Sequence, residues 1–256
     1  MSETSPRPVR RSDEHYTPIA SAYTTSAIHA QGADLARLVE LAALPAGALV
    51  LDVGTGTGHT GLAFAAAGAK FVGLDMTRAM LAEARGLATT RGVVFSPALG
   101  VAEALPFADG AFDAVVCRYC AHHFNDVGAA IHEMARVVRP GGIVLLDDHI
   151  APEDDAADEL INRLDWLRDP SHRREPRLSE YERWFSDAGL RVTTIEHRRE
   201  RIDADGWFAR AQTAPEREAD ARELMATATP ALRDLFAITS SPAGFDLHAV
   251  IIAARR

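Results

Sequence analysis

Short apolar segments alternate with longer amphipathic segments through the middle of the chain. Apolar segments of strand length occur at 50–53, 71–74, 93–95, 112–117 and 143–146. Segments with apolar residues at helical spacing lie between them at 58–68, 77–88 and 127–138. Strands that are apolar along their whole length are typical of a sheet buried on both faces. The alternation therefore predicts repeated βα units in an α/β fold with a doubly wound, mostly parallel sheet.

The regular alternation ends after residue 150. A charged, helix-prone insertion comes first, and further elements are expected at 179–188 (helix), 191–196 (strand), 204–237 (helical) and 245–253 (strand). This order favours a seven-stranded sheet into which the last strand returns as a hairpin. We expect a disordered tail at 1–13 and a single domain at 14–256, with a lid made of N-terminal helices at 14–45 and the insertion at 151–178.

Glycines occupy every second position after the first predicted strand. Asp52 ends this strand, and Gly54, Gly56 and Gly58 follow it. Glycine suits a sharp turn from strand to helix and allows the backbone to approach a ligand closely. Two cofactors are open at this point. The stretch 56–61 matches the dinucleotide pattern G-x-G-x-x-G with Asp75 downstream, whereas the acid before the first glycine favours S-adenosylmethionine.

Three further motifs follow in the order and spacing of one enzyme family. They are the A-E-x-L-P-F run at 102–107 with its F-D at 112–113, the H-H-F-x-D run at 122–126, and the E-x-x-R-V segment that ends in P-G-G at 133–142. With the glycine loop, they resemble class I S-adenosylmethionine methyltransferases of the type 11 family, which are related to the ubiquinone/menaquinone C-methylating enzymes. The resemblance covers about residues 50–148. It implies a Rossmann-like fold with a helical lid, and S-adenosylmethionine as the cofactor.

The resemblance also implies binding roles at matching positions. The methionine end of the cofactor would be held by Asp52, Gly54, Thr55 and Gly56, the ribose by Asp75, and the adenine by Met76, Ala102 and Glu103. Arg118 would offer its backbone carbonyl to the amine of the cofactor. Val101 departs from the family pattern, which has Asp at this position to contact the adenine amine.

An N-terminal segment with Tyr23 and His29 resembles the part of the family that folds over the cofactor. A ring face of Tyr23 would attract a sulfonium cation. The alternative is that Tyr16 and Tyr23 pack an amphipathic helix onto the sheet.

Candidate catalytic residues follow the fourth and fifth predicted strands. His122 and His123 come after one strand and Asp148 ends the other, so all three lie at the carboxyl edge of a parallel sheet, where ligands bind. A histidine oriented by an aspartate would remove a proton from the methyl acceptor. Which histidine faces the methyl group stays open, as does the choice of Asp148 over Asp147 or His149. We expect no metal, because Cys117 and Arg118 stand where a first ligand would follow the fourth strand.

Composition limits the partners of the protein. The 256 residues carry a formal net charge of −9, so a broad basic surface for nucleic acid is absent. The sequence shows no secretory signal and no membrane-spanning run. Cys117 and Cys120 fit buried, reduced thiols and a cytoplasmic protein. A homodimer stays open as the oligomeric state.

The expected activity is methyl transfer to carbon or oxygen of a small-molecule acceptor such as a phenol, a quinol or an enol. The alternative is a protein that keeps the fold and uses it for a pericyclic or decarboxylating step, or for binding only. Basic residues of the predicted lid fit an acceptor carboxylate or phosphate, or alternatively a solvated face; they are Arg168, His172, Arg173, Arg174 and Arg177.

Overall fold

A twisted sheet runs through the protein, and the computed structural model describes residues 9–25, 30, 32–241 and 243–256. The first five strands are parallel: β1 (Leu49–Val53), β2 (Lys70–Asp75), β3 (Phe95–Leu99), β4 (Phe112–Arg118) and β5 (Val138–His149). Two long strands, β6 (Arg191–Asp203) and β8 (Ala243–Arg255), complete the order β3-β2-β1-β4-β5-β8-β6. Because β8 lies antiparallel between β5 and β6, the predicted doubly wound, mostly parallel sheet with its returning last strand is confirmed. A two-residue strand, β7 (Thr239–Ser240), adds to β8.

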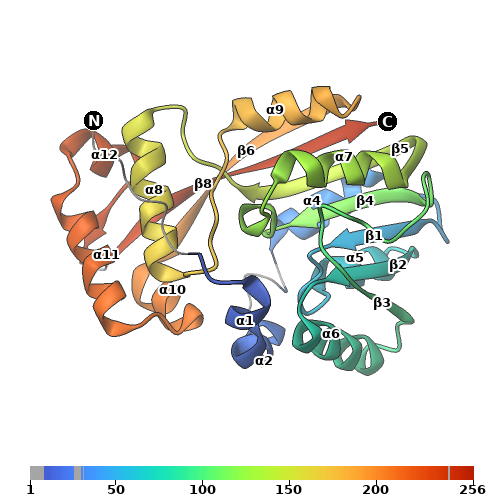
Figure 1. Ribbon diagram of the computed structural model, residues 1–256, viewed down its shortest axis with the longest axis horizontal. Helices are drawn as coiled ribbons and strands as arrows, with labels where there is room; N and C mark the ends of the chain where they lie inside the picture. Colours follow the sequence, from blue (N-terminus) through green and yellow to red (C-terminus); the bar gives the residue numbers. More distant parts are fainter. Residues whose placement is uncertain (1–8, 26–29, 31, 242) are drawn as a thin grey trace.

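Helices cover both faces of the sheet (Figure 1). Leu51 and Val53 of β1 pack on the face that holds α7 (Val127–Val137) and α9 (Leu178–Asp187). Val50 packs on the other face with α4 (Ala33–Ala42), α5 (His59–Ala66) and α6 (Arg78–Thr90). Successive strand residues point to opposite faces, and both faces are buried, which explains why β1 is apolar except for Asp52 near its end.

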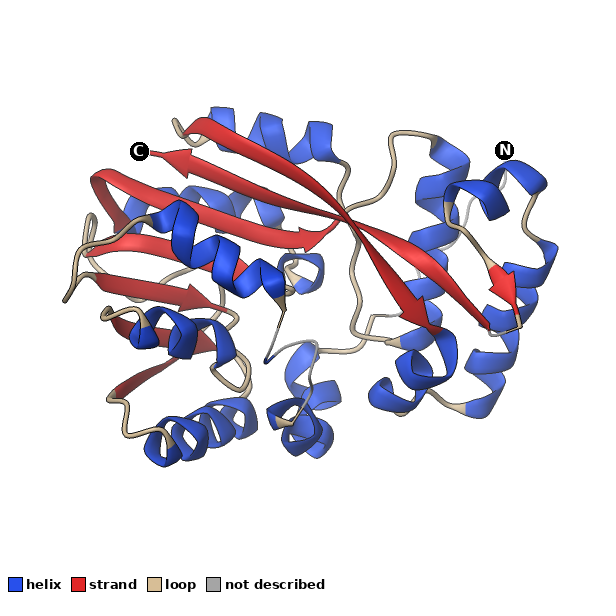
Figure 2. Cartoon of the chain, turned by 180° about the vertical axis from the view of Figure 1, so that it is seen from behind, coloured by secondary structure: helices blue, strands red, loops and turns tan. Residues whose placement is uncertain are grey.

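A separate helical layer surrounds the far halves of β6 and β8, which cross from the sheet into it (Figure 2). We call it the helical layer; it consists of α8 (Asp155–Arg168), α10 (Ala204–Ala211), α11 (Pro215–Thr227) and α12 (Pro230–Leu235). Leu164, Trp207 and Phe245 belong to its own hydrophobic core. The predicted lid, made of 14–45 and 151–178, stays a prediction, and the packing of its two parts differs. Its insertion supplies α8 and residues 204–235 add three helices, whereas α4 of the predicted N-terminal part packs on the sheet.

The N-terminal helices lie between the helical layer and α6 (Figure 1). They are α1 (Ser12–Tyr16), a 3₁₀ turn at Thr17–Ile19 (η1) and α2 (Ala20–Thr24). Ile19 and Tyr23 pack against Met80 of α6. The predicted tail at 1–13 lies partly outside the described residues. From residue 9 on it is placed, and the Arg10 amide donates to the Pro170 carbonyl at 2.8 Å.

The third strand was predicted two residues too early. Pairing begins at Phe95 opposite Phe71, while Val94 is 86% exposed after a turn in which Gly92 has a φ of +65°. Apolar residues alone placed the strand at 93–95, but the chain needs this turn after α6 before it can enter the sheet. Strands β5 and β6 are also longer than predicted, because pairing with β8 continues into polar residues.

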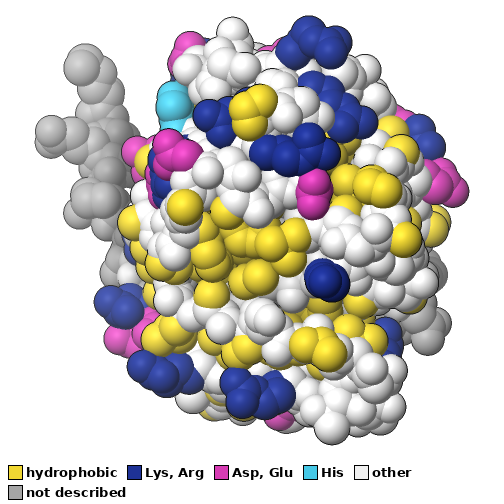
Figure 3. Space-filling model, turned by 90° about the vertical axis from the view of Figure 1, so that its right-hand side faces the viewer, with side chains coloured by type: hydrophobic (Ala, Val, Ile, Leu, Met, Phe, Trp, Pro, Cys, Tyr) yellow, Lys and Arg dark blue, Asp and Glu magenta, His cyan; other side chains and the backbone are white. Residues whose placement is uncertain are grey.

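The surface mixes residue types. On the face in Figure 3, hydrophobic side chains gather in the middle and basic side chains lie around them, with acidic ones interspersed. Among the described residues, no helix combines the length and apolar character that a membrane span needs.

Candidate active site

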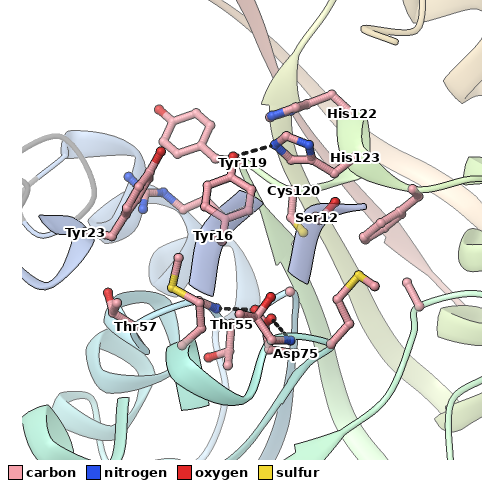
Figure 4. Close-up of a pocket in the computed structure, with 18 of the residues that line it drawn as sticks. Ser12, Tyr16, Tyr23, Thr55, Thr57, Asp75, Tyr119, Cys120, His122 and His123 are labelled. Carbon is pink, nitrogen blue, oxygen red and sulfur yellow. Dashed lines mark hydrogen bonds between the residues drawn. The ribbon is translucent and has the colours of Figure 1, made fainter. Parts of the chain in front are cut away.

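A cavity opens at the carboxyl ends of β1, β2 and β4, between the sheet and the helical layer. Strand order reverses between β1 and β4, and ligands of open α/β sheets bind at such a switch point. In Figure 4, Thr55 and Asp75 lie on one side of the cavity, and Tyr16, Tyr119, His122 and His123 on the other.

The glycine loop lines the first side of the cavity. Gly54 has a φ of +69°, and a Cβ added there would lie 2.1 Å from the Cys120 sulfur, so only glycine fits. Gly56 has a φ of +51°, and no described heavy atom lies within 4 Å of a Cβ built on it. The loop therefore leaves open space beside its backbone amides.

Asp52 lies behind this loop and does not line the cavity. Its carboxylate accepts hydrogen bonds from the Thr55 hydroxyl at 2.6 Å and the Gly61 amide at 3.0 Å. Burial raises the pKa of Asp52 to about 6. These contacts hold the loop against α5, and the predicted contact with the cofactor stays a prediction.

Asp75 lines the cavity at the end of β2 and is fixed by two backbone amides. One carboxylate oxygen accepts from Gly56 N at 2.9 Å and the other from Thr77 N at 2.8 Å. Burial raises the pKa of this carboxyl. The Glu103 carboxylate accepts a hydrogen bond from Asn125 N at 2.7 Å. This bond connects the part of the cavity predicted to bind adenine with the loop before α7.

The structure brings the predicted cofactor residues together with few exceptions. The cavity is lined by Tyr23, Gly54, Thr55, Gly56, Asp75, Met76, Ala102, Glu103 and Arg118. His29 lies outside the described residues. Open space beside glycine amides, a carboxylate at the tip of β2 and apolar Met76 fit the amino acid, ribose and adenine of S-adenosylmethionine. The individual roles stay predictions.

The Arg118 side chain is engaged in ion pairs within the protein. It is 2% exposed and its Nε donates to the Asp34 carboxylate, with Asp147 at 3.7 Å. Asp147 is fully buried and pairs with Arg198. Asp147 is therefore engaged in buried ion pairs, and its neighbours Asp148 and His149 turn toward His122 and the cavity.

His122 and Asp148 form the pair that the sequence predicted. His122 sits in a 3₁₀ turn at Ala121–His123 (η2), directly after β4. Its Nδ1 lies 2.6 Å from Asp148 Oδ1, and its backbone amide donates to Oδ2 at 3.2 Å. Burial opposes the charge on Asp148, but His122 lowers the pKa of this carboxyl below its usual value. Asp148 is thus an anion that fixes the ring, and within the described chain Nε2 of His122 has no hydrogen-bond partner.

His123 has a different environment. Its Nε2 lies 2.9 Å from the Tyr16 hydroxyl, which donates to Asp169 at 2.8 Å (Figure 4 shows the first contact). Burial lowers the pKa of His123 to about 4, so the ring is neutral at pH 7. Nδ1 of His123 lies 3.2 Å from the Ser171 carbonyl, so each ring nitrogen has a partner within the protein.

Several cavity residues had no recognisable signal in the sequence. Tyr119 adopts a φ of +52° after β4 and donates to Glu200, which also contacts His149 Nε2 at 3.3 Å. Glu200 comes from the part of β6 that extends beyond its predicted end, and the strained backbone of Tyr119 is invisible in a residue pattern.

Three side chains beside the cavity could act together as metal ligands. Among the described residues, His122, Asp148 and His149 offer ligand atoms within 4.8 Å of one another. The 2.6 Å hydrogen bond between His122 and Asp148 already accounts for two of these atoms. The expected absence of a metal stays a prediction.

Comparisons with known proteins agree with this geometry. The family model described as "Methyltransferase domain" matches residues 51–146. The uncharacterized methyltransferase YcgJ from Bacillus subtilis is 40% identical over 240 residues, which cover 91% of this chain and 94% of YcgJ. A demethylmenaquinone methyltransferase from Thermus thermophilus is 41% identical over 143 residues, covering 54% of this chain and 64% of that protein.

Solved structures extend the likeness to the whole fold. The crystal structure of YcgJ has a TM-score of 0.83 at 38% identity and covers 87% of this chain and 97% of its own. A putative methyltransferase from Bacillus halodurans has a TM-score of 0.84 at 31% identity, with 88% and 99% covered. The chain therefore belongs to the class I S-adenosylmethionine-dependent methyltransferases.

Proposed function

We propose that the protein transfers a methyl group to oxygen or carbon of a small acceptor such as a phenol, a quinol or an enol. The observation that carries the proposal is the His122–Asp148 pair beside the cavity that fits the cofactor. Such acceptors must lose a proton when they are methylated, and this pair supplies a base. The Thermus relative, named for demethylmenaquinone, supports a quinol as one candidate.

The cofactor, when bound, supplies a methyl group attached to a positively charged sulfur. The rest of the chemistry belongs to the residues of this chain. Asp148 accepts the Nδ1 proton of His122, which leaves the Nε2 lone pair to take the proton of the acceptor. The charge of Asp148 then stabilises the imidazolium. His123 is neutral and hydrogen-bonded to Tyr16, so it positions the site and does not act as the base.

Methyl-¹³C-labelled S-adenosylmethionine tests the proposal. The enzyme is incubated with phenol, quinol and enol acceptors, S-adenosylhomocysteine is quantified, and NMR locates the label. We expect one S-adenosylhomocysteine per labelled product, with the label on oxygen or carbon. A product formed without S-adenosylhomocysteine supports the pericyclic or decarboxylating alternative instead. Calorimetry that shows NAD(P)H binding and no S-adenosylmethionine binding refutes the proposal altogether.

The location in the cytoplasm, the absence of a nucleic-acid partner and a homodimer stay predictions. Size-exclusion chromatography with light scattering checks the last of them.

A further inference from the structure

Two arginines of the helical layer line the same cavity as the predicted base. Arg168 is the last residue of α8, and Arg210 belongs to α10. The Arg168 guanidinium lies 5.0 Å over the Trp207 ring, and its Nε donates to the Trp207 carbonyl at 3.2 Å. These contacts orient the guanidinium through Nε, and among the described residues its two terminal nitrogens have no hydrogen-bond partner, which leaves them to a ligand.

Arg210 has no internal partner in the described part of the chain. Within the described residues it forms no ion pair and no hydrogen bond; Asp203, whose carboxylate accepts from the Gly206 amide at 2.8 Å, acts on it only at longer range. Burial, and next the positive charge of Arg168, lower the pKa of Arg210. The two guanidinium groups thus repel each other in a partly buried space, which costs stability unless an anion joins them.

Two other basic residues of the predicted lid behave differently. Arg174 pairs with Asp158 at 2.6 Å and with Glu180 at 2.5 Å, and Arg177 pairs with Asp158 at 2.7 Å. Neither lines the cavity. Internal ion pairs therefore explain their charges, whereas the charges of Arg168 and Arg210 have no such pair.

Nearby carboxyl groups are engaged elsewhere. Asp169 accepts hydrogen bonds from Tyr16 and from the Ser171 hydroxyl, each within 2.8 Å. Glu175 is buried, and burial followed by the charge of Asp165 raises the pKa of Glu175 well above its usual value, which favours its neutral form. Asp165 and Asp169 offset part of the charge on Arg168 at longer range, but neither forms a contact ion pair with it.

We propose that the acceptor carries an oxyanion, a carboxylate or a phosphate, that binds Arg168 and Arg210 while its reacting atom lies at His122. The inference rests on the proposed function and names its acceptor class. Guanidinium groups bind both oxyanions with paired hydrogen bonds. Ile202, Trp207 and Leu247, which share the hydrophobic core of the helical layer with its helices, line the cavity, so the body of the acceptor is apolar or aromatic.

Binding to the protein loaded with S-adenosylhomocysteine tests this without requiring turnover. Calorimetry compares 4-hydroxybenzoate and 4-hydroxyphenyl phosphate with the neutral methyl 4-hydroxybenzoate. We expect the oxyanions to bind about tenfold or more tightly than the ester, since hydrogen bonds to charged groups are the strong ones. The oxyanion that binds more tightly identifies whether the acceptor carries a carboxylate or a phosphate.

Variants separate the cavity arginines from the others. Arg210→Gln is expected to weaken oxyanion binding about tenfold and to leave ester and S-adenosylhomocysteine binding unchanged. Arg210→Lys keeps the positive charge but loses the paired hydrogen bonds of the guanidinium. Its affinity for the oxyanions is expected to lie between those of wild type and Arg210→Gln. Arg163→Gln is the control, because Arg163 lies outside the cavity on α8, the helix that carries Arg168, and its guanidinium lies over the Trp166 ring.

The outcomes distinguish the oxyanion inference from the proposed methyl transfer on which it rests. Equal binding of ester and oxyanions, no binding of either oxyanion, or an unchanged Arg210→Gln variant overturns the oxyanion inference. If the labelling experiment still yields a methylated neutral acceptor, the methyltransferase proposal stands. Failure of the wild-type protein to bind S-adenosylhomocysteine overturns both.

Discussion

Replacement of His122 by Asn removes the proposed base but keeps a hydrogen bond to Asp148. The Asn side-chain nitrogen stands close to the position of Nδ1 and still donates to Asp148, whereas the basic Nε2 is lost. Asp148 also keeps the His149 amide at 2.8 Å and the backbone amide of residue 122 at 3.2 Å. The variant therefore removes the proposed chemistry and preserves the local network.

The structure sets the expected magnitudes. The 2.6 Å bond from His122 to the Asp148 anion is charge-assisted, and such bonds contribute about 1.5–3 kcal/mol. His122→Ala loses this bond and is expected to destabilise the fold by about 2 kcal/mol, while His122→Asn stays within about 1 kcal/mol of wild type. General bases contribute about 10²–10⁴-fold to rate, so both variants should lower kcat by at least ~10²-fold, or about 3 kcal/mol in the barrier.

The assay measures S-adenosylhomocysteine release at saturating cofactor and acceptor, with urea unfolding on the same samples. Affinity for S-adenosylhomocysteine is expected to stay unchanged, because Thr55 and Asp75 lie on the other side of the cavity (Figure 4). His132→Asn is the control, since this ring bonds the Gly128 carbonyl on α7 and does not line the cavity. Wild-type turnover in a folded His122→Asn enzyme would refute the base.

Two further predictions concern Asp75 and His123. Asp75→Asn should weaken S-adenosylhomocysteine binding about 10–100-fold by calorimetry, because a charged acceptor of hydrogen bonds is lost; equal affinity rejects the ribose role. Burial lowers the folded pKa of His123 from 6.5 to about 4, so as pH falls below about 6.5 the unfolded chain takes up the proton first and stability is lost. At about pH 5 this loss is about 2 kcal/mol, and urea unfolding at about pH 7.5 and pH 5 should show it in wild type but not in His123→Gln. Equal pH slopes count against a buried, neutral ring.

The parts of the fold that the sequence predicted correctly are those with local signals. Apolar β1 and the Gly54–Gly58 turn fixed the first βα unit, and the same logic located β2, β4 and β5. The third strand was predicted too early because Val93 and Val94 are residues typical of strands, although they lie just after a turn. Helical structure at 204–237 was expected, yet the joint core of these helices with α8 was not, since no local pattern shows which amphipathic faces meet.

Residue types and spacing alone indicated the methyltransferase family and placed histidines and an acidic residue at neighbouring strand ends, because glycines and strand ends have local meaning. Only the tertiary structure distinguished His122 from His123: the two rings are adjacent in sequence, but one faces Asp148 and the other Tyr16. It also separated Arg168, which lines the cavity, from Arg174 and Arg177, and it added Arg210 from 42 residues downstream. Side-chain partners from distant segments decide which charge is satisfied and which is left for a ligand.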